Sequence, residues 1–424
     1  MDEQAPKNVT SNTQSYDPIS TDAVQMGWMQ GFPPNPDRLI RFADGSLFRF
    51  PRTRWAFSHM RELVPTANVR RGSKAASTLP VALQDLDTLS FHCDDASTLT
   101  WAQMLLQTYT DSILVLHRGR IVYEKYFGAA KDYLPHSCYS ITKSFVGTLA
   151  AMLAHDGILD TSRLVTDYIA ELAGGAYQDV TVQQVMDMQV GVRYSEDYAD
   201  KAAEIWEYSR AGGMSPRKPG TSGPATFYEF LTTLQKEGEH GEAFAYKTVN
   251  TEVLAWILRR VTGMSLSTLL SEQIWQKIGA ENDAYFQVDA IGTEAGGGGL
   301  HVALRDLARF GEVMRLDGFH HGEQVIPASV VRDIYRGDDT AKFAKAGYPA
   351  IPGFDGYSYH NMWWVSNNSH RVIDGRGIYG QRLYIDPVAE MVIAKFSSHP
   401  VANSMETLPV TDRAFEALAG YLMG

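Results

Sequence analysis

Cysteine is scarce in this chain, and positive charge is outweighed by negative charge. The 424 residues include two cysteines, and the formal net charge at pH 7 is −11. Two cysteines do not indicate the disulfide framework of a small secreted domain. An acidic chain also lacks the basic surface that binds nucleic acid or an anionic membrane. We therefore expect no nucleic-acid or membrane partner, and a small molecule as the ligand.

Long apolar segments and an export signal are also missing. No stretch reaches the roughly 20 apolar residues that span a bilayer, and the opening MDEQAPKNVTSNTQSYDP has no basic region followed by an apolar one. The cytoplasm is the predicted location. With 44% hydrophobic residues, the chain can bury a large core as one large domain or as two lobes. A monomer and a homodimer are both compatible with the sequence.

The G-x-S-x-G turn of the α/β-hydrolases does not occur, but S-x-x-K occurs twice. Chance alone would produce so short a pattern about once or twice in such a chain, so its context must decide. The copy at Ser215–Lys218 lies in GGMSPRKPGTSG, which is too rich in glycine and proline to be anything but a loop. The copy at Ser140–Lys143 opens a regular apolar segment.

The segment that follows Ser140 has the pattern of a buried helix. Apolar side chains recur at helical spacing from Ile141 to Leu153, and Asp156-Gly157 provides a stop. Upstream, residues 112–127 have strand composition on both sides of an Arg-Gly turn, which predicts a hairpin. Ser140 is therefore expected between a sheet and the first turn of a core helix.

Such a position suits a nucleophile. A helix N-terminus favours an anionic oxygen, and Lys143, three residues on, points to the same side as Ser140. Burial would lower the pKa of this lysine and let it exchange a proton with the hydroxyl. A capping serine beside a lysine that reaches solvent is the alternative interpretation.

The order of predicted elements places strands early, helices in the middle and strands late. Residues 1–53 are a polar arm that wraps the body or is partly disordered. Residues 54–157 and 290–424 form an α/β lobe, in which the C-terminal strands make an antiparallel meander followed by a helix, and residues 158–289 form a mainly helical lobe. The sheet is thus completed by distant segments. Glycines 296–299 predict a tight turn and not a dinucleotide site.

Two later segments can complete a Ser-Lys site. Tyr246 lies in an irregular stretch just before a helix, with Asn250 and Thr251 as plausible caps, and a tyrosine beside an ammonium group can act as a base. The glycine-bearing strand 374–380 can offer a backbone N–H to an oxyanion. The structural alternatives are a core aromatic residue for Tyr246 and a bulged strand for 374–380.

Taken together, S-x-x-K, a tyrosine motif and a glycine-bearing C-terminal strand resemble the serine β-lactamase and penicillin-binding-protein superfamily, near class C enzymes and family VIII carboxylesterases. Within it the chain is similar to the 6-aminohexanoate-dimer (nylon-oligomer) hydrolases over roughly residues 54–396. The similarity is carried by RWAFSHMRELVPTANVRR, VTDYIAELAGGAY, QVMDMQVGVRYSEDY, YEFLTTL, AYKTVNTEVLAWILRRVTG, RDLARFG and YGQRLYIDP.

The resemblance implies an α/β fold in which helices from both ends of the chain flank an antiparallel sheet, with a helical insertion and no cofactor or metal. It implies that Ser140 is the nucleophile that forms an acyl-enzyme, Lys143 its partner and Tyr246 the proton shuttle. The oxyanion hole would consist of the N–H groups of Ser140 and Ile378. The implied substrate-binding residues are Tyr198, Ser209, Trp364 and Tyr379.

The sequence departs from the superfamily at three places. Asn250 follows Tyr246 by four residues where Y-x-N is usual, which makes a direct role for Asn250 doubtful. The third motif, K-T-G or H-x-G, is replaced by Gly-Arg-Gly, which weakens recognition of a β-lactam carboxylate unless Arg376 compensates. Ser209 stands where the nylon-oligomer enzymes that work best carry an aspartate that could pair with the substrate amine.

The predicted function is hydrolysis of small linear amides and short-chain carboxylic esters by a serine hydrolase. A β-lactamase or D,D-peptidase is disfavoured by the altered third motif and by the lack of an export signal. A non-catalytic binding or sensor protein on the same fold could have lost Lys143 or Tyr246, and this chain keeps both.

Overall fold

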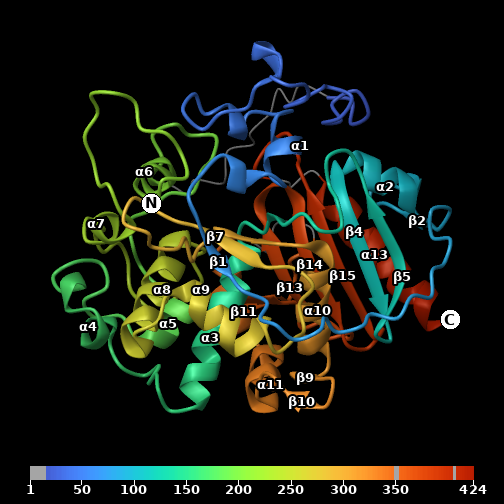
Figure 1. Ribbon diagram of the computed structural model, residues 1–424. Coiled ribbons are helices and arrows are strands. Elements are labelled where there is room, and N and C mark those ends of the chain that lie inside the picture. The colour runs from blue at the N-terminus through green and yellow to red at the C-terminus, as the bar shows by residue number, and fades with distance from the viewer. Residues whose placement is uncertain (1–15, 348–352, 404–406) are drawn as a thin grey trace.

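The structure, a computed structural model, describes residues 16–347, 353–403 and 407–424. Within these residues, seven strands form one antiparallel sheet (Figure 1). In spatial order the strands are β11 (Ser358–His360), β12 (Trp363–Val365), β13 (Ile373–Gly377), β14 (Gln381–Asp386), β15 (Met391–Ser397), β4 (Thr110–His117) and β5 (Arg120–Tyr126). The early hairpin therefore pairs with the late meander through β4 and β15, as the sequence predicts.

The β4–β5 hairpin turns at Arg118 and Gly119, both of which have positive φ (52° and 74°). This conformation matches the twist of the two strands, and glycine adopts it without steric cost. Both faces of the sheet are covered, so successive residues of β4 enter different cores. Leu114 and Leu116 belong to the core on one face, and Ile113 and Val115 belong to the core on the other.

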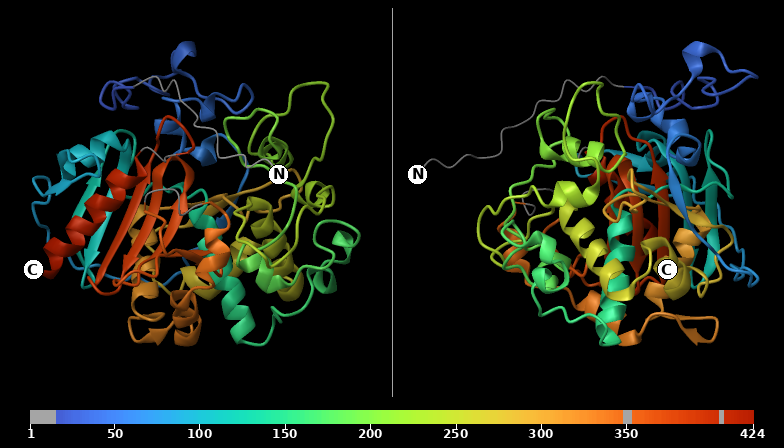
Figure 2. Two further views of the ribbon diagram at one scale, coloured as in Figure 1. Left: turned by 180° about the vertical axis from the view of Figure 1, so that it is seen from behind. Right: turned by 60° about the vertical axis from the view of Figure 1, so that its left-hand side comes forward.

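Helices cover the two faces of the sheet. On one face α2 (Trp101–Gln107) and the C-terminal helix α13 (Leu408–Met423) pack in a core that includes Trp101 and Phe415 (Figure 2, left). On the other face α10 (Leu304–Arg315) contacts β14, β15 and β4, and α3 (Ile141–His155) contacts β12, β13 and β14. The prediction of a helix after the meander is confirmed.

The middle of the chain is mainly helical (Figure 1). Its elements are α4 (Val165–Tyr168), η4 (Ala170–Leu172), α5 (Val182–Met186), α6 (Glu204–Ala211), α7 (Phe227–Leu231), α8 (Thr248–Thr262), α9 (Leu266–Leu270) and the π-helical turn η5 (Ser271–Trp275). Gly263 ends α8 with φ 67°, the glycine stop that the sequence indicates. Asn250 and Thr251 are not caps, because α8 begins before them and both are buried inside it.

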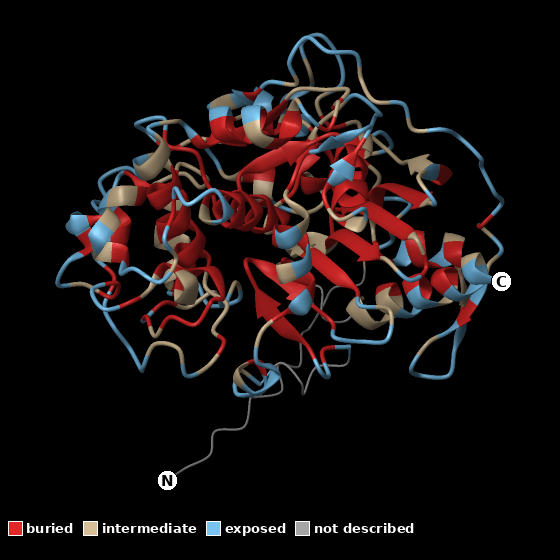
Figure 3. Cartoon of the chain, turned by 90° about the horizontal axis from the view of Figure 1, so that it is seen from below, coloured by how far each residue is buried: buried red, intermediate tan, exposed pale blue. Residues whose placement is uncertain are grey.

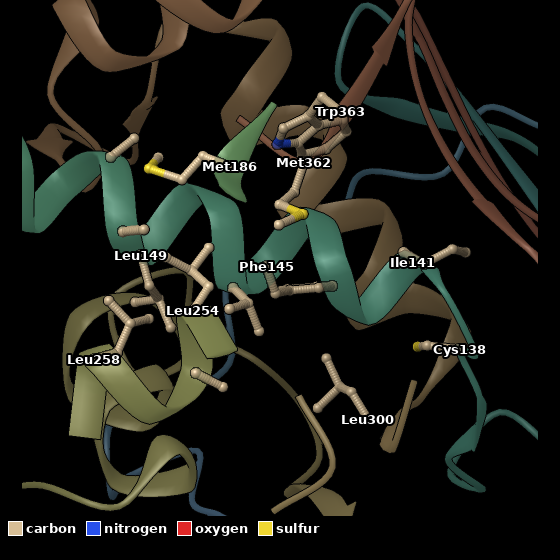
Figure 4. Close-up of a cluster of buried hydrophobic side chains, with 14 of the residues drawn as sticks. Cys138, Ile141, Phe145, Leu149, Met186, Leu254, Leu258, Leu300, Met362 and Trp363 are labelled. Atoms are coloured by element: carbon tan, nitrogen blue, oxygen red, sulfur yellow. The ribbon is translucent and has the colours of Figure 1, made fainter. Parts of the chain in front are cut away.

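Helix α3 is shared by the helical part and the sheet (Figure 4). Phe145 and Leu149 lie beside Leu254 and Leu258 of α8, while Met362 and Trp363 approach α3 from the sheet side. Nearly every residue of α3 is buried, which explains its apolar composition. Figure 3 shows the buried residues gathered where the sheet and the helices meet, with the exposed ones on the outer loops.

A second sheet joins segments from both predicted lobes. Its order is β1 (Thr66–Val69), β7 (Ala284–Gln287), β8 (Leu300–Val302) and β6 (His136–Ser137). The predicted boundary at residue 289 thus separates β7 from its partner β8. Strand β6 ends three residues before Ser140 and ties the start of α3 to this sheet.

The remaining elements are short. They are η1 (Pro36–Arg38), η2 (Ser46–Phe48), α1 (Thr53–Ala56), η3 (Met60–Glu62), β2 (Ser90–His92), β3 (Thr98–Thr100), β9 (Phe319–His320), β10 (Glu323–Gln324), α11 (Ala328–Arg336), α12 (Thr340–Ala344) and η7 (Ile378–Gly380). The described part of the predicted arm, residues 16–53, shares a small core with residues 54–64, and Tyr139 and Tyr379 pack against this core. In the described part of the chain no single helix is long and apolar enough to cross a bilayer. The pair α8 and α9–η5, bent by 80°, passes the same test by length and composition.

Candidate active site

Ser140 stands at the first turn of α3 with its hydroxyl free of any capping role. It is the N-cap residue, but its φ and ψ (−68°, −6°) are helical and its side chain makes no cap hydrogen bond. The preceding residue, Tyr139, has φ 45°, a left-handed conformation that is unfavourable for a bulky side chain. The backbone between β6 and α3 therefore makes a strained turn that leads directly into the serine.

Lys143 is buried beside this serine. Its side chain is 1% exposed, and its Nζ donates to Ser140 Oγ (2.8 Å) and to the Gly297 carbonyl (2.6 Å). Burial lowers the pKa of Lys143 to about 8, although the carboxylates of Glu196 and Glu252 act in the opposite direction. The alternative of a capping serine with a solvent-reaching lysine is therefore wrong.

Tyr246 precedes α8 by two residues and lies against the same lysine. Lys143 Nζ is 5.1 Å from the centre of the Tyr246 ring. The ring stacks on Trp364 of β12 (5.4 Å, 26°) and meets Tyr359 of β11 edge-on (5.9 Å). Four of the residues predicted for the site, Ser140, Lys143, Tyr246 and Trp364, are thus brought together from α3, the segment before α8, and the sheet.

The glycine-bearing strand β13 packs against the segment that carries Ser140. A Cβ atom on Gly377 would lie 2.5 Å from the Cys138 carbonyl oxygen, and one on Gly375 would lie 3.3 Å from Ile141 Cγ2. Position 377 therefore requires glycine, and position 375 would be tight for any side chain. Ile378 follows at once, and its carbonyl accepts a hydrogen bond from Gln381 Nε2 (3.1 Å), which also donates to the Ser397 carbonyl (2.7 Å). Gln381 thereby fixes the backbone next to Ile378.

The other predicted contact residues have partners of their own. Tyr198 meets Trp206 edge-on (6.1 Å), and Ser209 Oγ shares a hydrogen bond with Ser215 Oγ (2.6 Å). Tyr379, with φ 63°, packs against Phe57 and Tyr139. The substrate role of Tyr198, Ser209 and Tyr379 stays a prediction.

Two further residues singled out by the sequence, Ser215 and Arg376, have neighbouring polar partners. The second S-x-x-K copy makes no such site, because Ser215 bonds Ser209 and Lys218 is exposed. Arg376 of the altered third motif donates from Nε to Asp374 (2.6 Å) and from Nη2 to the Tyr357 hydroxyl (2.9 Å).

Two carboxylates near the lysine escaped the sequence analysis. Glu196 accepts a hydrogen bond from the Thr248 N–H at the start of α8, and burial raises its pKa. Glu252 lies inside α8, bonds to the glycine turn at 296–297, and also has its pKa raised by burial. For Glu252 the available signal was one charged residue in TVNTEVLAWIL, a helical stretch with no other charge. Over the described residues no group of three or more His, Cys, Asp or Glu side chains is placed to hold a metal ion.

Comparisons with known proteins agree with this geometry. A family model described as Beta-lactamase matches residues 103–414. The chain is 38% identical over 350 residues to 6-aminohexanoate-dimer hydrolase from Paenarthrobacter ureafaciens, which covers 82% of this chain and 86% of the relative. A solved structure from Bacillus anthracis, described as a candidate 6-aminohexanoate-dimer hydrolase, has a TM-score of 0.83 and 31% identity over 92% of this chain and 99% of its own.

More distant structures share the fold. A family VIII carboxylesterase superposes with a TM-score of 0.51 at 18% identity, covering 72% of this chain and 92% of its own. At this identity the likeness concerns the arrangement of helices and strands alone.

Proposed function

The chain belongs to the β-lactamase family of serine hydrolases, and from that premise we propose that it cleaves small linear amides and short-chain carboxylic esters through an acyl-enzyme on Ser140. The observation that carries this proposal is the hydrogen bond between Ser140 Oγ and the ammonium group of a fully buried lysine. A lysine whose pKa is about 8 is partly neutral near pH 7 to 8 and can accept the serine proton.

In the proposed mechanism, Ser140 Oγ attacks the carbonyl carbon while its proton passes to the neutral amine of Lys143, and Tyr246 relays that proton to the leaving group. The N–H groups of Ser140 and Ile378 donate to the oxyanion, supported by the N-terminal end of α3. Collapse breaks the bond to the leaving amine or alkoxide, which takes up the transferred proton, and leaves Ser140 acylated. Water then attacks the ester of the acyl-enzyme, the carboxylic acid departs, and the proton returns to Ser140.

The surroundings of the site favour linear substrates with an apolar acyl portion. Tyr246, Trp364 and Tyr359 provide aromatic walls, and the curated relative is named for the dimer of 6-aminohexanoate, a linear amide. Gly-Arg-Gly replaces the third motif, and Arg376 donates from Nε to Asp374 and from Nη2 to Tyr357, which leaves Nη1 for a ligand, so we expect weak binding of a β-lactam carboxylate. Short esters should react faster than amides, because an alkoxide leaves with less need of protonation than an amine. We further propose a cytoplasmic location, in keeping with two free cysteines.

A side-by-side substrate panel tests this function. Purified protein is assayed with p-nitrophenyl acetate, p-nitrophenyl butyrate, 6-aminohexanoate dimer and nitrocefin. We expect turnover of the esters, slower turnover of the amide and none above background for nitrocefin. Ser140→Ala should abolish all turnover, while Ser215→Ala, the matched change in the second S-x-x-K copy, should retain it. Nitrocefin as the best substrate would favour a β-lactamase, and no turnover of any compound would favour a binding protein.

A further inference from the structure

The glycine run 296–299 has a function beyond forming a turn. The N–H groups of Gly296 and Gly297 both point at the side chain of Glu252, donating to Oε2 (3.0 Å) and Oε1 (2.7 Å) respectively. The Tyr208 hydroxyl of α6 donates to Oε1 as well (2.7 Å). Glu252 is 1% exposed, and its carboxylate thus accepts three hydrogen bonds inside the protein.

The same turn holds the lysine of the catalytic pair. The peptide unit after Gly297 presents its carbonyl oxygen to Lys143 Nζ at 2.6 Å, and Nζ in turn donates to Ser140 Oγ. A continuous chain of hydrogen bonds therefore runs from Tyr208 through Glu252 and the turn to the nucleophile. Each of these groups is buried or half-buried, so solvent cannot easily substitute for a lost partner.

Close packing explains why the turn consists of glycine. A Cβ atom on Gly297 would lie 2.4 Å from Thr248 Cγ2 and 3.0 Å from Glu252 Oε1, and one on Gly296 would lie 2.6 Å from Ala255 Cβ. Any side chain at these positions would push the turn away from α8. The glycines let the backbone approach the carboxylate.

We propose that Glu252 is a positioning residue for the Ser140–Lys143 pair, which it aligns by fixing the Gly297 carbonyl through the turn at 296–297. The inference rests on the proposed function. A lysine side chain has four rotatable bonds and a compact charge, so its direction is set by the acceptors around it. Without Glu252 the turn loses its anchor, and the Gly297 carbonyl no longer holds Nζ on the side of Ser140.

The pKa of Lys143 offers a second readout of the role of Glu252. The charged and titratable groups that act on it are Glu196, from the segment before α6, Glu252 of α8 and the ring of Tyr246. The hydrogen bond from Tyr208 and the charge of Arg259, on the same helix, both act to lower the pKa of Glu252. Because the Glu252 carboxylate raises the pKa of Lys143, a neutral residue at position 252 should lower that pKa further.

The test compares Glu252→Gln with a matched control. Gln keeps the size of the side chain but removes the charge, and its NH2 group cannot accept from a glycine N–H. With p-nitrophenyl acetate, kcat should fall about 10²-fold, the effect of a displacement of roughly 1 Å in a catalytic group, while KM changes less than about twofold. The midpoint of the pH–kcat profile should move to lower pH.

Asp306→Asn is the control. Asp306 is as deeply buried and also accepts from two successive backbone N–H groups, those of Glu281 (2.7 Å) and Asn282 (3.0 Å), but it has no bond to the catalytic group. It should lower thermal stability at least as much as Glu252→Gln does, because Asp306 also forms a buried ion pair with Arg309 (2.9 Å), while kcat and the pH profile stay at wild-type values. A loss of kcat in both variants in proportion to their loss of stability would show that Glu252 is merely structural.

Gly297→Ala gives a second route that leaves the charge of Glu252 intact. Gly297→Ala should reproduce the loss of kcat without shifting the pH–kcat profile, because the charge of Glu252 remains. If Glu252→Gln does not fold, kcat of Gly297→Ala alone tests the positioning role. Wild-type kcat in Gly297→Ala, or in folded Glu252→Gln, overturns the inference. Ser140→Ala is measured in parallel. If it loses all turnover while the Glu252 and Gly297 variants keep wild-type kcat, the proposed function holds and only the inference about Glu252 fails. An inactive wild-type protein would contradict both the proposed function and the inference.

Discussion

Replacing Lys143 by methionine should make the protein inactive and more stable at pH 7. The folded state holds this lysine with a pKa of about 8, against an ordinary value of 10.5, because burial penalises the ammonium group. That difference corresponds to about 3 kcal/mol of free energy that folding loses at neutral pH. Methionine has a similar length and no charge. It leaves the Gly297 carbonyl without its donor, which costs about 1 kcal/mol, so the variant should gain about 2 kcal/mol.

The gain should depend on pH in a definite direction. Between pH 8 and 10.5 the unfolded wild type binds more protons than the folded wild type, so wild-type stability rises with pH through this window. The variant lacks the group and shows no such rise. Its advantage should therefore be complete below about pH 8 and should have vanished by pH 10.5.

Urea unfolding followed by tryptophan fluorescence at pH 7, 8, 9 and 10 measures the difference between the two proteins. Lys395→Met serves as a reference, because Lys395 is equally buried in β15 and its pKa is lowered to about 7, mainly by burial. Its stability difference should begin to decline about one pH unit earlier. A Lys143→Met protein that is less stable than wild type at pH 7, or a difference that does not vary with pH, would refute the reasoning.

Three further predictions concern the site. Tyr246→Phe and Lys143→Ala should each lower kcat by several orders of magnitude. The double variant should lose little more than the worse single variant, because the two residues form one proton relay. A double variant whose loss of kcat equals the product of the two single losses would contradict this. Ser209→Asp should raise kcat/KM for amino-terminated linear amides and leave the N-acetylated amides unchanged, because the carboxylate would attract only a free ammonium group; equal rates for both would place residue 209 outside the pocket. Gly377→Ala should lower kcat about 10²-fold by pushing β13 off the Cys138 carbonyl, whereas Gly420→Ala, in open space on α13, should keep full activity and gain up to about 1 kcal/mol in thermal unfolding.

Local sequence patterns predicted the elements on which the catalytic serine and lysine lie. The apolar spacing from Ile141 to Leu153 and the stop at Asp156-Gly157 defined α3, and the Arg-Gly turn defined the β4–β5 hairpin. These signals are local, because a buried helix and a tight turn constrain their own residues. The order of strands and helices along the chain predicted that early and late segments share one sheet, but not that β15 is the strand that pairs with β4.

Contacts between distant segments escaped prediction. Asn250 was expected to cap α8, but it lies inside the helix and accepts a hydrogen bond from the buried Tyr177 hydroxyl (2.8 Å). Glu252 meets two N–H groups more than forty residues away, and no local pattern indicates that meeting. Polar partners across a core are set by tertiary packing.

Covalent labelling tests the role of Ser140 most directly. Wild-type protein is treated with a fluorophosphonate, its intact mass is measured, and the modified peptide is sequenced. One adduct on Ser140 is expected, with none in Ser140→Ala and normal labelling in Ser215→Ala, because the buried lysine activates Ser140 alone. An adduct on Ser215 or any other residue, or an unlabelled wild-type protein that still hydrolyses p-nitrophenyl acetate, would contradict the assignment of Ser140 as the nucleophile.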